Sequence, residues 1–579
     1  MGGRGRTAFA LGAIVLAFAA AVMPTGWYSA IPLPPQMPAP PVSGVTLLRG
    51  LMLLEAVALM LASVFQWHVP RLSAEQRYGG SANWNSTNDC GPRTAGWCLG
   101  VITLLALALR LFHANADLWL DEISPIMDYG SMPVFQVIGS YLRSNNHLLN
   151  TLLLKLSIAI FGEHEWSVRL AAILFGVASI PVLYWCARLA LSREASLGAA
   201  LLLTVSYHHV FFSQNARGYS AYIFFALLGT RLLADALRED RFWIWSAYVI
   251  TVVLGFASLL NTAFVLAAHG LICLGALWVV HRRGDAAGPL AFRLTIVFVI
   301  AAVLSLQLYI VALPEVYVVI THVYTSQSTG FVLFSLDFVR EVVRGVAAGF
   351  GPGILVAAVP FLLVAFAGFV ALVRRRWVLA LALALPGALT ATFLVVRGLT
   401  FSPRFFLLWL PLTMITAVLT VQLGVAWIFR HRTAPSRMIM ATVILVLATL
   451  SAASLPGYYA VPKQPFRQAL STTERLAGPN DRIFVIYTAE KGIRYYGARL
   501  AQPIDQRYRF VRSVGALDSA LAMRGTGRIL LIVTFERALR MELPELYARM
   551  SSGWAVRSRF AGTVGDGGIT IWDEKVAVH

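Results

Sequence analysis

The sequence predicts a polytopic α-helical membrane protein with a small α/β domain at its C-terminal end. Three observations support this fold class. The chain is 58% hydrophobic and only 13% charged, and its mean hydropathy is +0.70. Apolar runs of roughly 20 residues, the length that a membrane-crossing helix needs, recur up to Pro456. After Pro456 these runs stop, and short patterns typical of buried strands begin.

About thirteen runs are long and apolar enough to span a bilayer by the hydropathy criterion. They are residues 7–24, 46–66, 93–113, 166–190, 197–213, 219–238, 242–260, 263–281, 291–313, 351–373, 377–396, 404–429 and 438–456. Residues 7–24 could instead be a cleaved signal peptide, and either assignment leaves the loop that follows outside.

The net charge of +19 comes mostly from arginine and follows the positive-inside rule. If the N-terminus is cytoplasmic, nearly every inside loop carries arginine, so we expect a multi-pass protein of the inner (plasma) membrane. The apolar residues 148–162 must then not cross, and we expect an interfacial helix with Lys155 reaching toward the headgroups. Because the positive charge is explained by arginines in loops beside the lipid bilayer, which is an expected partner, we expect no nucleic-acid partner.

The chain divides into three predicted parts. Residues 1–92 form a two-helix membrane appendage with a cytoplasmic loop. Residues 93–456 form a transmembrane core with external loops at 114–165 and 314–350. Residues 457–579 form an extracytoplasmic α/β domain, with strands expected at 482–488, 528–534 and 569–572.

The external stretch LWLDEISPIMDYG, residues 118–130, carries three acids in an apolar setting. Ser124 and Pro125 predict a helix start, as N-cap and first helical residue. Asp128 then lies in that helix, and Asp121 and Glu122 are not needed as caps. They could be solvated, or paired with Arg110 or Arg143. Asp121 could also be a general base, because an apolar boundary raises the basicity of a carboxylate.

The stretch NNHLLN, residues 145–150, places Asn146 and His147 at the start of the interfacial helix. Histidine is the commonest metal-ligand side chain. His147 and Glu122 could therefore hold a divalent cation at the outer face, although spacing alone does not show it. A metal cofactor is left open.

Two further external motifs place arginine where the positive-inside rule disfavours it. FFSQNARGYSAY, residues 211–222, contains Arg217 and Tyr219, and RGLTFSPRFF, residues 397–406, contains Arg397 and Arg404. These arginines could bind the phosphate of an anionic lipid or merely contact headgroups. In the loop 314–350, His322 and Tyr324 are polar residues that could line a site.

Taken in order, these motifs resemble the membrane glycosyltransferases of the GT-C fold. The closest resemblance is to the protein O-mannosyltransferase and aminoarabinose-transferase group, of the glycosyltransferase 39 type, over roughly residues 93–510. The family's Ala-Arg-Pro-Tyr is matched here by Arg217 and Tyr219 with Gly218 in place of proline. Arg404 matches the arginine of its late Arg-Tyr, with Phe405 in place of the tyrosine. Asp121, with Glu122 beside it as a second catalytic candidate, best matches the acid in the family's first external loop. His147 matches the family's position for a histidine or acid, but two leucines replace the Pro-Pro that follows.

The resemblance implies an inverting transfer of a sugar from a polyprenyl-phosphate donor to an acceptor hydroxyl on the extracytoplasmic face. The acid of the first external loop is implied to be the catalytic base, and the acceptor could be a glycan, lipid or protein of the cell envelope. The rival hypotheses are a transporter of lipid-linked glycans or polysaccharide, and an assembly protein without activity. The sequence leaves the sugar unspecified.

Overall fold

The computed structural model describes residues 3–24, 42–64, 89–140, 146–322, 354–397, 403–429, 433–499, 504–522 and 527–575. The chain forms two compact units, each assembled from separate stretches of sequence. The helical unit comprises Met1–Arg110, Met132–Leu154 and Ala171–Ala452. The sheet unit comprises Leu111–Ser131, Lys155–Leu170 and Ala453–His579, so it contains part of the first predicted external loop as well as the C-terminal region.

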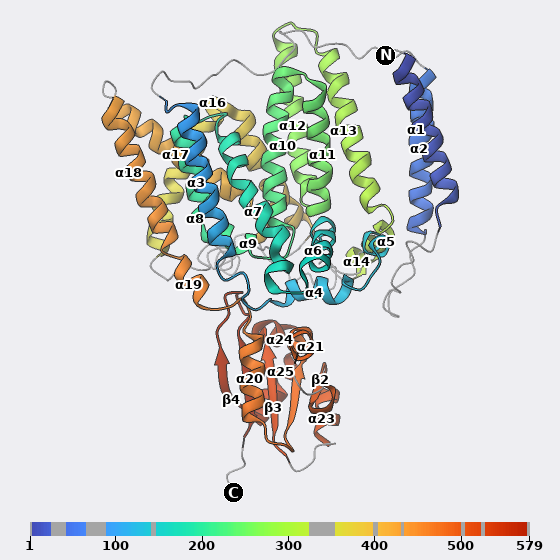
Figure 1. The fold of residues 1–579 in the computed structure, drawn as a ribbon, viewed down its shortest axis with the longest axis vertical. Coiled ribbons are helices and arrows are strands. Elements are labelled where there is room, and N and C mark those ends of the chain that lie inside the picture. Colours follow the sequence, from blue (N-terminus) through green and yellow to red (C-terminus); the bar gives the residue numbers. More distant parts are fainter. Residues whose placement is uncertain are drawn as a thin grey trace. The chain divides into compact units, whose positions relative to one another are not determined.

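The helical unit is a bundle of apolar helices (Figure 1). Its elements are α1 (Gly3–Val22), α2 (Gly44–Val64), α3 (Pro92–Leu111), α5 (Val134–Gly139), α6 (Leu148–Phe161), α7 (Glu165–Ala187), α8 (Arg193–Val205), α9 (Tyr207–Ser213), α10 (Tyr219–Glu239), α11 (Phe242–Ser258), α12 (Thr262–Arg282), α13 (Gly288–Tyr309), α14 (Leu313–His322), α16 (Ile354–Val396), η2 (Pro403–Phe406), α17 (Trp409–Ile428) and α18 (Thr433–Ala452). Of these, α3, α6 and α7 also contribute residues to the sheet unit.

The protein is a multi-pass membrane protein. Among the described residues, nine helices are long and apolar enough to cross a bilayer, or ten if the bent pair α8–α9 is one span. The number is below the thirteen expected for three reasons. The helix α11 and the described part of α1 are short, α8–α9 is bent by 62°, and the two runs expected at 351–373 and 377–396 are joined in α16. Within α16, Arg376 has non-helical dihedrals (φ −146°, ψ 58°) that mark the expected break.

The break between α8 and α9 is stabilised by Arg110 from α3. The Arg110 side chain is fully buried. It donates to the Thr204 carbonyl, which the break removes from the helical ladder, at 3.3 Å, to Ser213 Oγ at 3.2 Å and to His209 Nδ1 at 2.6 Å. Arg110 is one of the two arginines that the sequence offers as partners for the external acids. These hydrogen bonds instead engage its guanidinium at the break between α8 and α9.

The sheet unit contains a five-stranded mixed sheet in the order β2-β1-β3-β5-β4. β1 pairs in parallel with β2 and β3, whereas β5 pairs antiparallel with β3 and β4. The elements are α4 (Leu120–Tyr129), α19 (Leu455–Ala460), α20 (Phe466–Leu476), β1 (Arg482–Ile486), η3 (Tyr487–Ala489), α21 (Glu490–Gly497), α22 (Ile504–Arg507), β2 (Tyr508–Val511), α23 (Val514–Ala522), β3 (Ile529–Thr534), α24 (Glu536–Glu542), α25 (Pro544–Gly553), β4 (Trp554–Phe560) and β5 (Ile569–Glu574).

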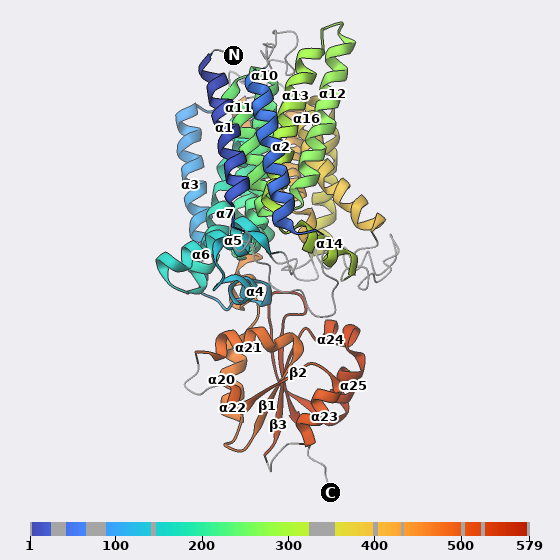
Figure 2. The ribbon, with the colours of Figure 1, turned by 90° about the vertical axis from the view of Figure 1, so that its right-hand side faces the viewer.

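Helices cover both faces of this sheet. Figure 2 shows α20, α21 and α22 on one side of the strands and α23, α24 and α25 on the other. Because both faces are covered, all six residues of β3 are buried, and the strand reads as a continuous apolar run. The expected strands at 482–488, 528–534 and 569–572 are confirmed as β1, β3 and β5. The sequence analysis missed the two edge strands, β2 and β4, whose polar composition gives a weak signal.

Candidate functional site

The external acids lie at the start of α4, within the sheet unit. The expected helix start at Ser124 and Pro125 is wrong: Trp119 is the N-cap, and both residues lie inside the helix. Asp121 and Glu122 therefore occupy the first helical turn, where their negative charge is favourable to the helix dipole. The helix can begin this early because backbone N–H groups at its start, which have no acceptor within the helix, donate to side chains elsewhere in the sheet unit.

Glu122 is a buried structural ion, with its side chain fully inaccessible. Arg169, near the start of α7, donates from Nε to Glu122 Oε1 and from Nη2 to Oε2, both at 2.8 Å. The remaining donors of Arg169 reach the carbonyls of Ala114, Ala116 and Asp117 at 2.8–3.0 Å. All five N–H groups of one guanidinium thus fix the backbone that leads to α4.

Three successive amides before Asp121 are also bonded. The Leu118 N–H donates to Tyr496 Oη at 2.6 Å, and the Trp119 N–H donates to Glu122 Oε2 at 3.3 Å. The Leu120 N–H donates to Gln464 Oε1 at 2.7 Å. Two of these three acceptors, Tyr496 and Gln464, come from the C-terminal region of the sequence.

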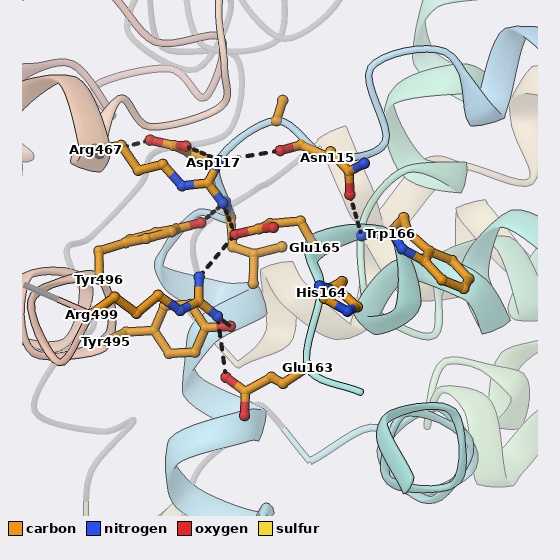
Figure 3. Close-up of polar contacts among 12 residues, drawn as sticks. Asn115, Asp117, Glu163, His164, Glu165, Trp166, Arg467, Tyr495, Tyr496 and Arg499 are labelled. Carbon is orange, nitrogen blue, oxygen red and sulfur yellow. Dashed lines mark hydrogen bonds and ion pairs between the residues drawn. The ribbon is translucent and has the colours of Figure 1, made fainter. Parts of the chain in front are cut away.

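Asp117 is held by α20. The backbone N–H of Arg467 donates to Asp117 Oδ2 at 2.8 Å, and its guanidinium lies 3.3 Å from Oδ1. Figure 3 shows Arg467 also contacting Glu165, which Arg499 contacts in turn at 3.1 Å. Burial raises the pKa of the Asp117 carboxyl, and the contacts with Arg467 oppose that shift. These pairs tie α20 and α21 to the start of α7 and to residues 111–131, the segment with the external acids that is called the acid loop below.

Asp128 and Lys155 have structural contacts at the other end of α4. Lys491 Nζ lies 2.6 Å from Asp128 Oδ2 and 3.4 Å from Ser124 Oγ. Lys155, expected to reach toward lipid headgroups, instead donates to the carbonyls of Tyr129 and Gly130 at 3.2 and 2.5 Å. The last carbonyls of a helix have no intrahelical donor, which explains this preference.

Asp121 lies in the first turn of α4, directly beside Glu122. The residue is half-buried, and the backbone that carries it is held on both sides by the hydrogen bonds of Leu120 and Glu122.

Lys463 lies beside Glu122, with Nζ 3.4 Å from Oε1, and its side chain is only 4% exposed. Burial lowers the pKa of Lys463, Glu122 opposes this shift and the nearby Arg169 adds to it, and together these effects bring the pKa to about 7. The lysine therefore exchanges its proton near neutral pH within the charged centre of the unit.

The helical unit brings together several other predicted site residues. Arg217 is 4% exposed, and its guanidinium lies 5.5 Å from the centre of the Tyr219 ring. The edge of His147 meets the same ring, with centroids 5.5 Å apart. A Cβ on Gly218 would stand 1.9 Å from the Ser258 carbonyl oxygen and 3.0 Å from His147 Nδ1. Gly218 is thus required by close packing, since its φ of −71° is available to any residue.

His147 is buried as a neutral acceptor. Its Nδ1 lies 3.1 Å from the Ser258 carbonyl, which fixes the proton on Nδ1. Within the described part of the chain, Nε2 has no hydrogen-bond partner. Burial lowers the pKa of His147 well below its ordinary value, and the charges of Arg217 and, less strongly, Arg404 add to that shift. The imidazole is therefore neutral beside two guanidinium groups.

The other predicted residues are placed as follows. Asn146 donates to the carbonyls of Val137 and Ser140 at 3.0 and 2.8 Å, and these hydrogen bonds fix the end of α5. Arg404 is half-buried in η2, with its guanidinium 5.5 Å from the Phe405 ring centre. Arg397 is exposed directly after α16. Tyr324, Arg143 and the side chain of His322 lie outside what the structure describes.

The two proposed metal ligands do not fit a divalent cation. The carboxylate oxygens of Glu122 already accept from Arg169 twice and from the Trp119 N–H, with Lys463 beside them. Arg217 and Arg404 place positive charge near His147, and this charge repels a cation. A cation at either residue would have to overcome these charges, so we derive no step through a metal.

One other group could ligate a metal among the described residues: Asp89, Cys90 and Glu194. Both carboxylate oxygens of Asp89 accept from the Arg193 N–H at 3.0 Å, and the Arg188 guanidinium lies 3.6 Å away. Because Asp89 caps α8 and is already neutralised, this cluster is explained by helix capping.

The sequence analysis missed the residues that organise the acid loop. They are Arg169, Lys463, Gln464, Arg467 and Tyr496. Only Arg169 had a usable signal, since an arginine in the first turns of an apolar helix needs an acidic partner. The others lie more than 340 positions from the acids they serve, and no local pattern reveals such a contact.

Comparison with known families adds one match. Residues 148–310 match the model of the dolichyl-phosphate-mannose-protein mannosyltransferase family. This stretch contains Arg217 and Tyr219 but neither Asp121 nor Arg404. The match confirms the resemblance to membrane glycosyltransferases that the motif order indicated. No curated protein sequence matches the chain.

Several solved structures resemble the chain at low sequence identity. ArnT from Cupriavidus metallidurans in the apo state is 13% identical, with 83% of this chain and 98% of that one covered and a TM-score of 0.48. The same protein bound to undecaprenyl phosphate is 14% identical with the same coverage and score. The oligosaccharyltransferase of Archaeoglobus fulgidus in the apo form is 12% identical, with 79% and 71% covered and a TM-score of 0.47.

Proposed function

We propose that this protein is an inverting glycosyltransferase that moves a sugar from a polyprenyl-phosphate donor to an acceptor hydroxyl at the extracytoplasmic membrane face. The observation that carries the proposal is the environment of Asp121. It is a half-buried acid on a turn that Arg169 and two capping side chains hold in place. A general base needs this combination of access and fixed position. The family match over residues 148–310 supports the reaction class.

In the proposed reaction, the Asp121 carboxylate takes the proton of the acceptor hydroxyl as its oxygen attacks the anomeric carbon. The new glycosidic bond forms while the bond from the anomeric carbon to the phosphate oxygen breaks. The bonding electrons leave with polyprenyl phosphate, and a single displacement of this kind inverts the anomeric centre. Glu122 is assigned a positioning role, because Arg169 and Lys463 occupy its carboxylate.

The leaving phosphate gains negative charge, which requires cationic stabilisation. Arg217 is assigned this role because it is a buried guanidinium held against Tyr219, with Arg404 and the exposed Arg397 as further cations for the phosphate. The neutral His147 offers Nε2 as an acceptor for a sugar hydroxyl. The membrane of residence is proposed to be the inner membrane, with the N-terminus in the cytoplasm.

The test uses full-length protein in lipid nanodiscs with radiolabelled polyprenyl-phosphate sugars and a panel of envelope acceptors. Wild type is expected to release polyprenyl phosphate and form an inverted glycoside. Asp121→Asn should lower the rate at least about 100-fold, because general-base catalysis contributes this much or more. Asp518→Asn, an equal charge change on the exposed side of α23, is the control and should remain active.

Full turnover by Asp121→Asn would remove Asp121 from the mechanism. Tight donor binding without consumption, in wild type and across the donor panel, would instead favour the transporter of lipid-linked glycans.

A further inference from the structure

The residue directly before Asp121 is bonded to the C-terminal part of the chain. The Leu120 N–H donates to Gln464 Oε1 at 2.7 Å. Leu120 is the first residue of α4, so its amide belongs to the group that lacks an acceptor within the helix. Gln464 therefore serves as a helix cap supplied from 344 positions away. Its position determines where the first turn of α4 begins.

Gln464 is itself bonded to the sheet. It is fully buried, and its Nε2 donates to Thr534 Oγ1, at the end of β3, at 3.1 Å. The Thr534 hydroxyl donates to the Gly568 carbonyl at 3.0 Å, immediately before β5. A continuous series of hydrogen bonds thus connects the end of β3 and the residue before β5 to the backbone beside Asp121.

The segment around Gln464 has little freedom to shift. The Pro462 carbonyl accepts from the Thr563 N–H at 3.1 Å. A Cβ on Gly567 would stand 3.2 Å from Gln464 Cγ and 2.6 Å from the Val564 carbonyl oxygen. The loop between β4 and β5 therefore packs directly on the glutamine side chain and fixes its rotamer.

We propose that Gln464 is a positioning residue for Asp121, and that the C-terminal α/β domain takes part in the transfer reaction through it. This inference rests on the proposed function, in which Asp121 is the base. Gln464 reaches the reaction only through the Leu120 amide. A base displaced by about 1 Å can cost roughly 100-fold in rate, so a cap at this amide has a large effect on turnover.

The test compares three variants in full-length protein in nanodiscs. Gln464→Leu keeps the approximate size and removes both hydrogen bonds. Gln464→Glu retains an acceptor oxygen for the Leu120 N–H. Gln468→Leu makes the same chemical change on the exposed side of α20 and is the matched control. The readouts are the single-turnover rate constant per bound donor, the donor dissociation constant, and hydrogen exchange across residues 118–122.

Gln464→Leu is expected to lower the rate constant by about 10–100-fold, with donor affinity and binding stoichiometry unchanged. Hydrogen exchange at residues 118–122 should become faster. Gln464→Glu should recover most of the rate, and Gln468→Leu should match wild type. A role confined to stability would instead reduce the binding stoichiometry and leave the rate constant per bound donor intact, which would overturn the inference.

The exchange readout separates this inference from the proposed function. If Asp121→Asn is inactive while Gln464→Leu has the wild-type rate constant and wild-type exchange, the positioning role is wrong and the base assignment stands. If Asp121→Asn turns over normally, the base assignment fails, and the inference falls with it even where Gln464→Leu speeds exchange.

Discussion

Asp121 and Glu122 are adjacent residues with opposite environments. Glu122 is fully buried and ion-paired, and Asp121 is half-buried on the same helical turn. Two adjacent acids can therefore take different roles, because consecutive positions of a helix point about 100° apart and face different surroundings. The pair Glu122–Arg169 keeps the turn in place, and the proposed base is the residue beside it.

Lys463 makes the stability of this centre pH-dependent. Its pKa is about 7 in the folded protein and near 10.5 once exposed by unfolding. Between these values the unfolded chain binds the proton and the folded chain does not, so stability rises as pH increases from about 7 toward 10. Below pH 7 both states are protonated, and the full cost of burying the charge is present. Lys463→Met should remove this dependence.

The measurement is the apparent melting temperature of the detergent-purified protein between pH 6.5 and 9.5. The difference between wild type and Lys463→Met isolates the lysine, because all other groups titrate in both proteins. The Lys575→Met variant, at a lysine in the C-terminal segment, is the control and should follow wild type. If the melting temperature changes with pH in the same way in all three proteins, the pKa of Lys463 in the folded protein is not near 7.

At the scale of elements, α20 and α21 act as one support for the acid loop. α20 contributes Arg467 to Asp117, and α21 contributes Tyr496 to Leu118. The two helices meet at Gly492, where a Cβ would stand 2.0–2.5 Å from the Phe466 ring. The spacing of the two helices, and hence of their contacts to the loop, depends on this glycine.

Gly492→Ala is therefore expected to destabilise the protein by about 1–3 kcal/mol, the usual cost of overpacking a buried contact. It should also lower transfer activity, because Arg467 and Tyr496 move with their helices. Gly515→Ala, in α23 where the added Cβ meets nothing within 4 Å, is the matched control. Thermal unfolding and single-turnover rates check both effects. If Gly492→Ala and Gly515→Ala have the same unfolding temperature and the same single-turnover rate, the acid loop does not depend on the spacing of α20 and α21.

The elements also show what local sequence can predict. β1, β3 and β5 were predictable because strands covered on both faces need continuous apolar runs. The start of α4 was not, because Ser124-Pro125 is the stronger local signal and the caps that overrule it, Gln464 and Tyr496, come from distant sequence. The acids were recognisable as a candidate site, since charge at an apolar boundary is costly, but their ion-pair partners were not.

At the scale of the whole molecule, the membrane character was predictable and the division into units was not. Long apolar runs identify membrane helices from composition alone. The sheet unit, in contrast, is assembled from Leu111–Ser131, Lys155–Leu170 and Ala453–His579. The acid loop thus belongs with the C-terminal domain although it lies between membrane helices in sequence. Hydropathy contains no information about such an association.

The proposed orientation can be tested with one introduced cysteine at a time, in a background where Cys90 and Cys98 are replaced by serine and only the buried Cys186 and Cys273 remain. Gln468→Cys, exposed on α20, should react with a membrane-impermeant thiol reagent in intact spheroplasts. Arg283→Cys, exposed between α12 and α13, should react only after permeabilisation, because the arginine-rich loops are expected in the cytoplasm. The reverse pattern would invert the topology and place Asp121 on the cytoplasmic side.

The distance in sequence between Leu120 and its cap Gln464 has a consequence for biosynthesis. Ribosomes add about 5–20 residues per second, so the 344 positions between them take roughly 20–70 s to make. During that interval the first turn of α4 exists without its cap, and the proposed base has no fixed position. If Gln464 positions the base as proposed, the nascent chain stays inactive until its C-terminal domain has been made and folded, and a prematurely terminated product inserts in the membrane without acquiring activity.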